Sequence, residues 1–98
     1  MADTPEAKVK RKVKEELASI GAYFVLPVTG GFGNSGVPDI LCCFKGRFIG
    51  IECKANGGKV TRLQQAHLDD IEKHGGISFV VDEHNIKILK QLILEKTK

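Results

Sequence analysis

The sequence predicts one α/β domain, residues 1–98, in which helices flank a central mixed sheet. Three observations carry this prediction. Apolar residues recur at helical spacing in three separate stretches, short runs rich in β-branched and aromatic residues lie between them, and a glycine turn joins two of those runs. The expected order is helix, strand, strand, strand, helix, strand, helix. A chain of 98 residues accommodates one such domain with a modest core.

Composition narrows the classes of protein to consider. With 42% apolar and 28% charged residues, the chain is typical of soluble globular proteins. No apolar run approaches the roughly 20 residues that span a bilayer, and the first residues lack the apolar core of a signal peptide. The three cysteines form neither a disulfide framework nor a zinc-ligand spacing. We therefore expect a cytoplasmic protein with no membrane partner.

Residues 5–20 are predicted to form the first helix. Thr4 is a suitable N-cap, Pro5 suits the first helical position, and Gly21 is expected to end the helix. Apolar residues at spacings of 4, 4 and 3 form one stripe: Val9, Val13, Leu17 and Ile20.

The same helix carries a dense run of cations. Five of them fall within seven residues: Lys8, Lys10, Arg11, Lys12 and Lys14. Such a run is an electrostatic footprint for a nucleic-acid backbone, although a solvated helix face has the same composition. The net charge of +3 does not decide between these interpretations.

A strand and a glycine-rich loop follow. Residues 22–28 favour a strand because they are rich in aromatic and β-branched residues, and Pro27 indicates an edge strand or its end. Residues 29–36 contain four glycines, and the backbone N–H groups of such a loop can approach phosphates closely. We expect Gly31, Gly33 and Asn34 to contact nucleic acid, whereas the alternative is a connecting loop that needs positive φ angles. No Gly-Lys-Ser/Thr follows, so no nucleotide cofactor is expected.

The next stretch predicts a hairpin with charged residues at its open end. Residues 40–44 and 48–51 are apolar runs on either side of a turn at Gly46. Residues i and i+2 of a strand share a face, so Glu52 and Lys54 project together. Antiparallel pairing then returns Asp39 to their side. Two carboxylates and an ammonium at the end of an apolar hairpin reduce the stability of the fold, because charged groups lose water there. Their presence in spite of this cost suggests a functional site.

The chemistry that this cluster supports is narrow. Mg²⁺ is often bound by one or two carboxylates together with water and substrate phosphate. A lysine beside the ion can orient a water nucleophile or stabilise charge that develops on a phosphate. The alternative interpretation is a strand end that carries a solvated Glu52–Lys54 pair.

The remaining elements complete the α/β pattern. Thr61 can cap a helix over residues 62–74, which Gly75 and Gly76 would end. Residues 77–81 predict a short buried strand, and residues 83–96 a final helix. The expected buried side of the middle helix comprises Leu63, Ala66, Leu68 and Ile71.

The order of these motifs resembles a known nuclease family. Asp39 followed by Glu52-x-Lys54 across a hairpin, with twelve residues between the acids, is the pattern of the PD-(D/E)xK nucleases. Nearly the whole chain looks like a stand-alone, phage-type VRR-NUC domain of that superfamily. The similar stretches are Pro5-Glu6, Val9-Lys10, Leu26-Pro27-Val28, Gly36-Val37-Pro38-Asp39, the run from Gly46 to Lys54, Thr61-x-Leu63-Gln64, and Gly75-Gly76.

This resemblance implies a restriction-endonuclease-like αβββαβ(α) core and a Mg²⁺- or Mn²⁺-dependent endonuclease. It implies Asp39, Glu52 and the backbone carbonyl of Cys53 as metal ligands, and Lys54 as the catalytic lysine. It also implies a homodimer that cuts branched DNA, such as four-way (Holliday) junctions, and a viral origin in a bacterial host. The family's helical glutamine corresponds to Gln64.

The helical acid of the family and its final strand leave open points. The acid corresponds best to Glu6, with Glu16 as the alternative; the two lie roughly 15 Å apart along a helix, so one of them can reach the site. The Val-Arg-Arg segment that gives the family its name is Val80-Val81-Asp82 here. This sequence has no arginine in that segment, so any role of the family's arginines there is in doubt.

Two other functions compete with the nuclease. One is a catalytically silent nucleic-acid-binding module that uses the basic first helix, and the other is a small structural or regulatory protein. A homodimer is also predicted from the final helix, whose apolar spread is wider than one face of a monomer core needs. The alternative is that these residues pack on the monomer's own sheet: Ile86, Ile88, Leu89, Leu92, Ile93 and Leu94.

Overall fold

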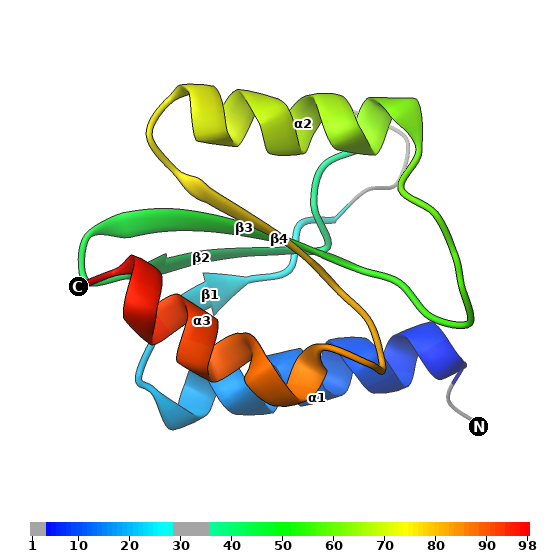
Figure 1. Ribbon diagram of the computed structural model, residues 1–98, viewed down its shortest axis with the longest axis horizontal. Coiled ribbons are helices and arrows are strands. Elements are labelled where there is room, and N and C mark those ends of the chain that lie inside the picture. Colours follow the sequence, from blue (N-terminus) through cyan, green and yellow to red (C-terminus); the bar gives the residue numbers. More distant parts are fainter. Residues whose placement is uncertain (1–3, 29–35) are drawn as a thin grey trace.

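A computed structural model describes residues 4–28 and 36–98, and these form an α/β fold with a four-stranded mixed sheet. Figure 1 shows three layers, with α2 on one face of the sheet and α1 and α3 on the other. The strand order is β1-β2-β3-β4, antiparallel except for the parallel pair β3–β4. The elements are α1 (Pro5–Ser19), β1 (Tyr23–Val25), β2 (Ile40–Phe44), β3 (Arg47–Cys53), α2 (Arg62–Lys73), β4 (Ile77–Val81), the 3₁₀ turn η1 (Ile86–Ile88) and α3 (Leu89–Lys96).

The β2–β3 hairpin forms as predicted. Phe44 pairs with Arg47, so the connection is a two-residue turn. Lys45 and Gly46 both have positive φ, 53° and 76°, as the type I′ turn requires. This turn fixes the register in which Ile40 faces Ile51, and the register determines which residues meet at the open end of the hairpin.

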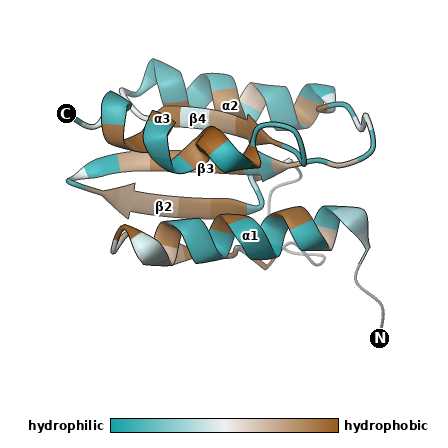
Figure 2. Cartoon of the chain, turned by 60° about the horizontal axis from the view of Figure 1, so that its bottom comes forward, coloured by the Kyte–Doolittle hydropathy of each residue, from teal (hydrophilic) through white to brown (hydrophobic). Residues whose placement is uncertain are grey.

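One face of the sheet holds the main core. The predicted stripe of α1 is confirmed, because Val9, Val13 and Leu17 are buried against the strands. Figure 2 shows β2 and β3 as mostly apolar strands between helices whose outer surfaces are polar. No helix among the described residues is long and apolar enough to cross a membrane.

The middle helix begins where predicted but buries a different side. Thr61 caps α2 through a capping box with Gln64. Leu68 is buried and Ile71 half-buried, whereas Leu63 and Ala66, expected on the buried side, are exposed. The reason is tertiary: α2 packs chiefly on β3 and β4, and no element among residues 4–28 and 36–98 covers its opposite flank.

Two other boundaries differ from the prediction. The first strand covers three residues instead of seven, since the chain leaves the sheet before Pro27, which has no N–H to donate. The final α-helix begins at Leu89, preceded by η1, instead of at residue 83. Before it, Asp82 Oδ1 accepts the N–H groups of His84 and Asn85. Such side-chain bonds replace the backbone bonds of a helical turn.

Candidate active site

The candidate site lies at the end of the sheet where β2 begins and β3 ends. Continuing the register of the hairpin places Asp39 opposite Glu52. Asp39 Oδ2 accepts a hydrogen bond of 2.8 Å from the Cys53 N–H, which joins the entry of β2 to the last residue of β3. The structure thus brings Asp39, Glu52 and Lys54 together, as the hairpin predicts.

Glu52 is the most unusual residue of the site. It is only 2% exposed, and its Oε2 lies 3.5 Å from the Nζ of Lys54, whose side chain is also largely buried. The pKa of Glu52 is raised to about 7, chiefly by burial and then by the negative charge of Asp39, against the lowering effect of Lys54. A solvated surface pair, the alternative interpretation, therefore does not describe Glu52 and Lys54.

Lys10 differs from the other cations of α1 because it is paired with a residue of the candidate site. Its Nζ lies 3.7 Å from Asp39 Oδ1, and both side chains are partly buried. Lys8, Arg11 and Lys12 are exposed, and Lys14 is half-buried. Sequence reasoning grouped Lys10 with the other cations and missed its place in the site, although its position next to the buried Val9 was the available signal.

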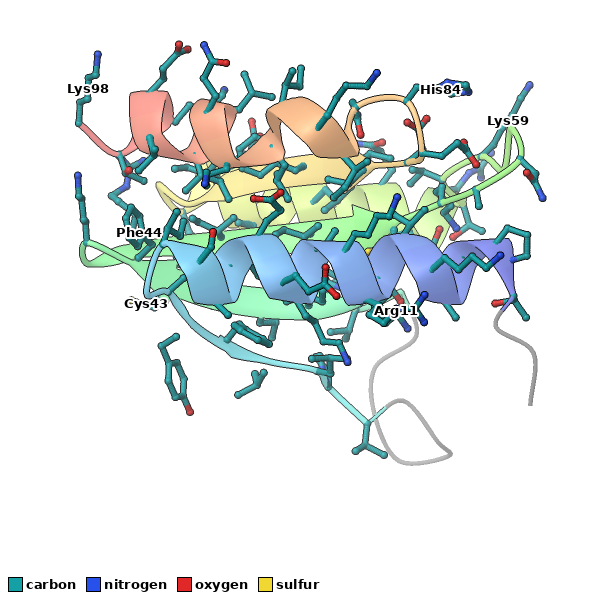
Figure 3. The ribbon with its side chains drawn as sticks, turned by 90° about the horizontal axis from the view of Figure 1, so that it is seen from below. Arg11, Cys43, Phe44, Lys59, His84 and Lys98 are labelled. Carbon is teal, nitrogen blue, oxygen red and sulfur yellow. The ribbon has the colours of Figure 1, made fainter. Side chains whose placement is uncertain are left out.

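Other basic side chains share this end of the molecule. Figure 3 shows Arg11, Lys59 and His84 at the same end, and Phe44 and Lys98 at the opposite end. Lys59 lies five residues beyond Lys54, in the loop that leaves β3. Sequence analysis did not group Lys59 or His84 with the basic residues of α1, because their loops come together only in the folded chain.

Glu6 and Glu16 lie at different distances from the site. Glu6 is in the first turn of α1, at the end of the molecule where β3 ends (Figure 1). Its negative charge contributes to the raised pKa of Cys53, about 12, although burial is the main cause and Asp39 the next. Glu16 lies ten residues further along α1. The position of Glu6 therefore agrees with its assignment as the helical acid, and its catalytic role stays a prediction.

The first turn of α2 supports the site from the other side. A Cβ on Gly36 would lie 2.7 Å from the carbonyl carbon of Leu63, so the segment that leads into Asp39 packs directly on this turn. Gln64 Oε1 accepts the Thr61 N–H as part of the capping box. The structure thus gives Gln64 a structural role at the helix start, and its catalytic role stays a prediction. Gly31, Gly33 and Asn34 lie outside the described residues.

The donors at this end suit a hard divalent cation. The negative charge of Asp39 raises the pKa of the neighbouring Glu52, and a cation between the two carboxylates would relieve that repulsion. The N–H and carbonyl of one strand residue point to the same side, so the Cys53 carbonyl is directed, like its N–H, toward Asp39. In the part of the chain that is described, no three His, Cys, Asp or Glu side chains form a metal-binding group. Mg²⁺ and Mn²⁺ accept such a set, completed by water and phosphate, whereas a structural zinc site does not.

Comparisons with known proteins add no identification. No protein-family model matches the chain, and no curated protein matches it either. Function must therefore be inferred from the residues and geometry of the site.

Proposed function

We propose that the protein is a Mg²⁺- or Mn²⁺-dependent endodeoxyribonuclease with a restriction-endonuclease-like core of the VRR-NUC type. The observation that carries the proposal is the burial of Glu52 beside Asp39 and Lys54. Two adjacent carboxylates at the end of a sheet cost stability in the metal-free protein. A site that binds a cation and a phosphate explains why this cost is tolerated.

Each residue has a distinct task in this proposal. Asp39, Glu52 and the Cys53 carbonyl would hold the metal ion, which when bound supplies an activated water and polarises a phosphate oxygen. Asp39 is held in place by the Cys53 N–H. Lys54, fixed by its ion pair with Glu52, directs its ammonium at the attacking water or at the charge that builds on the phosphate. In the reaction, the bond from water oxygen to phosphorus forms and the bond from phosphorus to the leaving oxygen breaks.

The basic residues supply the backbone attraction that such an enzyme needs. Lys8, Arg11 and Lys12 are exposed on α1, whose first turn lies beside the site, and Lys59 lies at the same end (Figure 3). Phosphate contacts of this kind bind DNA without regard to sequence. Selectivity for branched DNA, which we also propose, would then come from the geometry in which two sites are presented.

Cleavage of fluorescent four-way junctions and linear duplexes tests the function. We expect products with Mg²⁺ or Mn²⁺, none with EDTA, and none from Glu52→Gln with either cation. Lys98→Gln is the matched control, because Lys98 lies at the end of the molecule away from the site (Figure 3). Salt-dependent binding without products under every cation would instead identify the catalytically silent nucleic-acid-binding module.

A further inference from the structure

One cation of α1 belongs to the candidate site, although α1 and α2 lie on opposite faces of the sheet (Figure 1). Val9 of α1 is buried in the main core. The next residue, Lys10, carries an ammonium whose Nζ lies 3.7 Å from Oδ1 of Asp39. The side chains of Lys10 and Asp39 are 33% and 22% exposed. The core packing of α1 thus holds this ammonium beside the carboxylate.

The two carboxylate oxygens of Asp39 have different partners. Oδ2 accepts a hydrogen bond of 2.8 Å from the Cys53 N–H, and this donor is fixed in the backbone of β3. Oδ1 faces the Lys10 ammonium at 3.7 Å, which is longer than a hydrogen bond. Oδ1 therefore has the weaker attachment, and it is the oxygen of Asp39 that can change its partner.

Each carboxylate of the site has a lysine of its own. Glu52 is paired with Lys54 at 3.5 Å, and Lys10 does the same for Asp39. Neighbouring carboxylates repel each other, and an opposite charge within about 4–6 Å offsets this repulsion. The charge of Lys10 is also felt inside the site. The pKa of Cys53 is raised to about 12 by burial and then by Asp39, and the positive charge of Lys10 opposes this rise. Two ammonium groups thus balance the carboxylates of the metal-free site.

The two lysines differ in their freedom to move. The side chain of Lys54 is 13% exposed and that of Lys10 33%. Lys54 also lies against the loop that follows β3, because a Cβ on Gly58 would be 3.8 Å from its Cδ. A lysine ammonium is carried on a flexible stem of four carbons, so Lys10 can turn toward solvent without any movement of α1. Of the two lysines, Lys10 is the one that can leave its carboxylate.

We propose that Lys10 is the built-in counter-cation of the metal-free site, and that its ammonium holds Asp39 Oδ1 until a divalent cation takes that oxygen. This inference rests on the cation site of the proposed function and adds its regulation. While Lys10 faces Oδ1, it stabilises the metal-free protein. The same ammonium opposes cation binding, because it must leave the oxygen and because two positive charges repel each other across a partly buried site.

The rival interpretation is that Lys10 tethers Asp39 in the position that a cation needs. In that case, removal of the ammonium would weaken cation binding. Two other contacts already position Asp39: its Oδ2 is held by the Cys53 N–H, and the segment that leads into it packs on α2 at Gly36. The geometry therefore favours competition over tethering, and the two interpretations predict opposite changes in cation affinity.

This role differs from the one that the basic run of α1 suggests. In the sequence, Lys10 is one of five cations that could contact a DNA backbone. In the folded chain its ammonium faces a carboxylate, whereas Lys8, Arg11 and Lys12 are exposed. Lys10 is therefore assigned to the control of cation binding, and the general attraction for a phosphate backbone is left to the exposed residues.

Calorimetry with Mn²⁺ on the metal-free protein, without DNA, tests the competition. Lys10→Gln should bind Mn²⁺ about twofold to fivefold more tightly than the wild type, in line with the strength of a partly exposed ion pair. Lys14→Gln is the matched control, because Lys14 is also half-buried on α1 but lies about 6 Å further along the axis. Its Mn²⁺ affinity should stay near the wild-type value. Lys10→Arg, which keeps the charge, should bind Mn²⁺ no more tightly than the wild type.

Urea unfolding in EDTA tests the same ion pair without any metal. Lys10→Gln should lower stability more than Lys14→Gln does, because Asp39 then lacks its counter-charge. In an Asp39→Asn background Lys10→Gln should cause no such loss, since a double-mutant cycle isolates the interaction between the two side chains. In saturating Mn²⁺ the difference between Lys10→Gln and the wild type should shrink, because the protein that binds the cation more tightly gains more stability from it. Circular dichroism spectra before unfolding show that each variant is folded.

Two results would overturn the proposal. One is a Mn²⁺ affinity of Lys10→Gln that equals or falls below that of the wild type, and the other is a stability loss by Lys10→Gln that is the same in the Asp39→Asn background. Either result, together with Mn²⁺-dependent cleavage by the wild type, rejects the counter-cation and leaves the nuclease assignment in place. Tighter Mn²⁺ binding by Lys10→Gln in a protein that cleaves no DNA supports the counter-cation and rejects the nuclease. A wild type that binds no Mn²⁺ rejects both.

Discussion

At the residue scale, Glu52 links the site to the pH dependence of stability. Its pKa lies near 4.5 unfolded and at about 7 folded, so the native protein binds the extra proton between these values. This contribution to stability is fully present below pH 4.5 and is lost as the pH rises through about 7. In EDTA, the free energy of unfolding of the wild type should therefore fall across that window.

The Glu52→Gln variant isolates this effect. It should be more stable than the wild type above pH 7, by up to about 3 kcal/mol, since each pKa unit is worth about 1.4 kcal/mol. Its stability should also change less between pH 5 and 7 than that of the wild type. Urea unfolding followed by circular dichroism measures both quantities. Parallel stability curves for the two proteins would show that Glu52 is not the buried acid responsible.

Substitutions of Asp39 and Lys54 should impair cleavage at different steps, metal binding and catalysis. Asp39→Asn keeps an oxygen that can accept the Cys53 N–H, so the fold should survive, but the loss of a negative ligand should lower Mn²⁺ affinity. Lys54→Ala should keep metal binding and lose about 10²-fold or more in cleavage rate, like the loss of other electrostatic donors. Calorimetry with Mn²⁺ and single-turnover cleavage separate the two effects. Unchanged Mn²⁺ binding by Asp39→Asn would refute its assignment as a ligand.

At the element scale, helix α1 carries both candidates for the helical acid, Glu6 and Glu16, and only its first turn lies beside the site. We expect Glu6→Gln to reduce cleavage much more than Glu16→Gln, because the first turn of α1 lies beside the end of β3 and Glu16 lies roughly 15 Å further along the axis. Both acids have a partly or fully exposed position, so the pair is matched for folding. Steady-state cleavage of one junction by both variants gives the ranking, and the reverse ranking would transfer the role to Glu16.

The contact between the segment that leads into Asp39 and α2 can be tested by replacing Gly36 with alanine. Gly36 and Gly21 both have positive φ, 86° and 74°, so an alanine at either position is strained by roughly 1–2 kcal/mol. At Gly36 the new Cβ would also meet the backbone of Leu63 at 2.7 Å, whereas at Gly21 it meets nothing within 4 Å. Gly36→Ala should therefore be the more destabilising change, and it alone should lower Mn²⁺ affinity by displacing Asp39. Equal effects on Mn²⁺ binding would mean that this contact does not position the carboxylate.

At the scale of the whole molecule, substrate preference depends on how the cations are arranged. A four-way junction should compete for binding better than linear duplex at equal phosphate concentration and moderate salt, if two basic first helices are presented by one dimer. Fluorescence anisotropy in competition format measures this preference, and the duplex affinity gives the part of the binding that backbone contacts supply. Equal competition by duplex and junction for the wild type would remove junction preference while leaving the nuclease assignment in place.

Local features of the sequence determined the parts of the structure that depend on neighbouring residues. The hairpin turn at Gly46, the caps Thr4 and Thr61, and the bounds of β4 follow from turn chemistry, side-chain capping and apolar periodicity. The meeting of Asp39 with Glu52 also followed, because a strand's period of two and a tight turn fix which residues face each other.

Tertiary structure decided what local patterns do not encode. Periodicity shows that α2 is amphipathic, but the position of the helix over β3 and β4 left Leu63 exposed. The spacing of Glu52 and Lys54 is the same in a solvated strand end and in a buried site; the layers packed around β3 made Glu52 almost inaccessible and raised its pKa. Lys10 met Asp39 because α1 packs along one face of the sheet, with its first turns at the end where β3 finishes (Figure 1). Burial and charge pairing are set by which layers cover a residue, and that depends on contacts between segments distant in the chain.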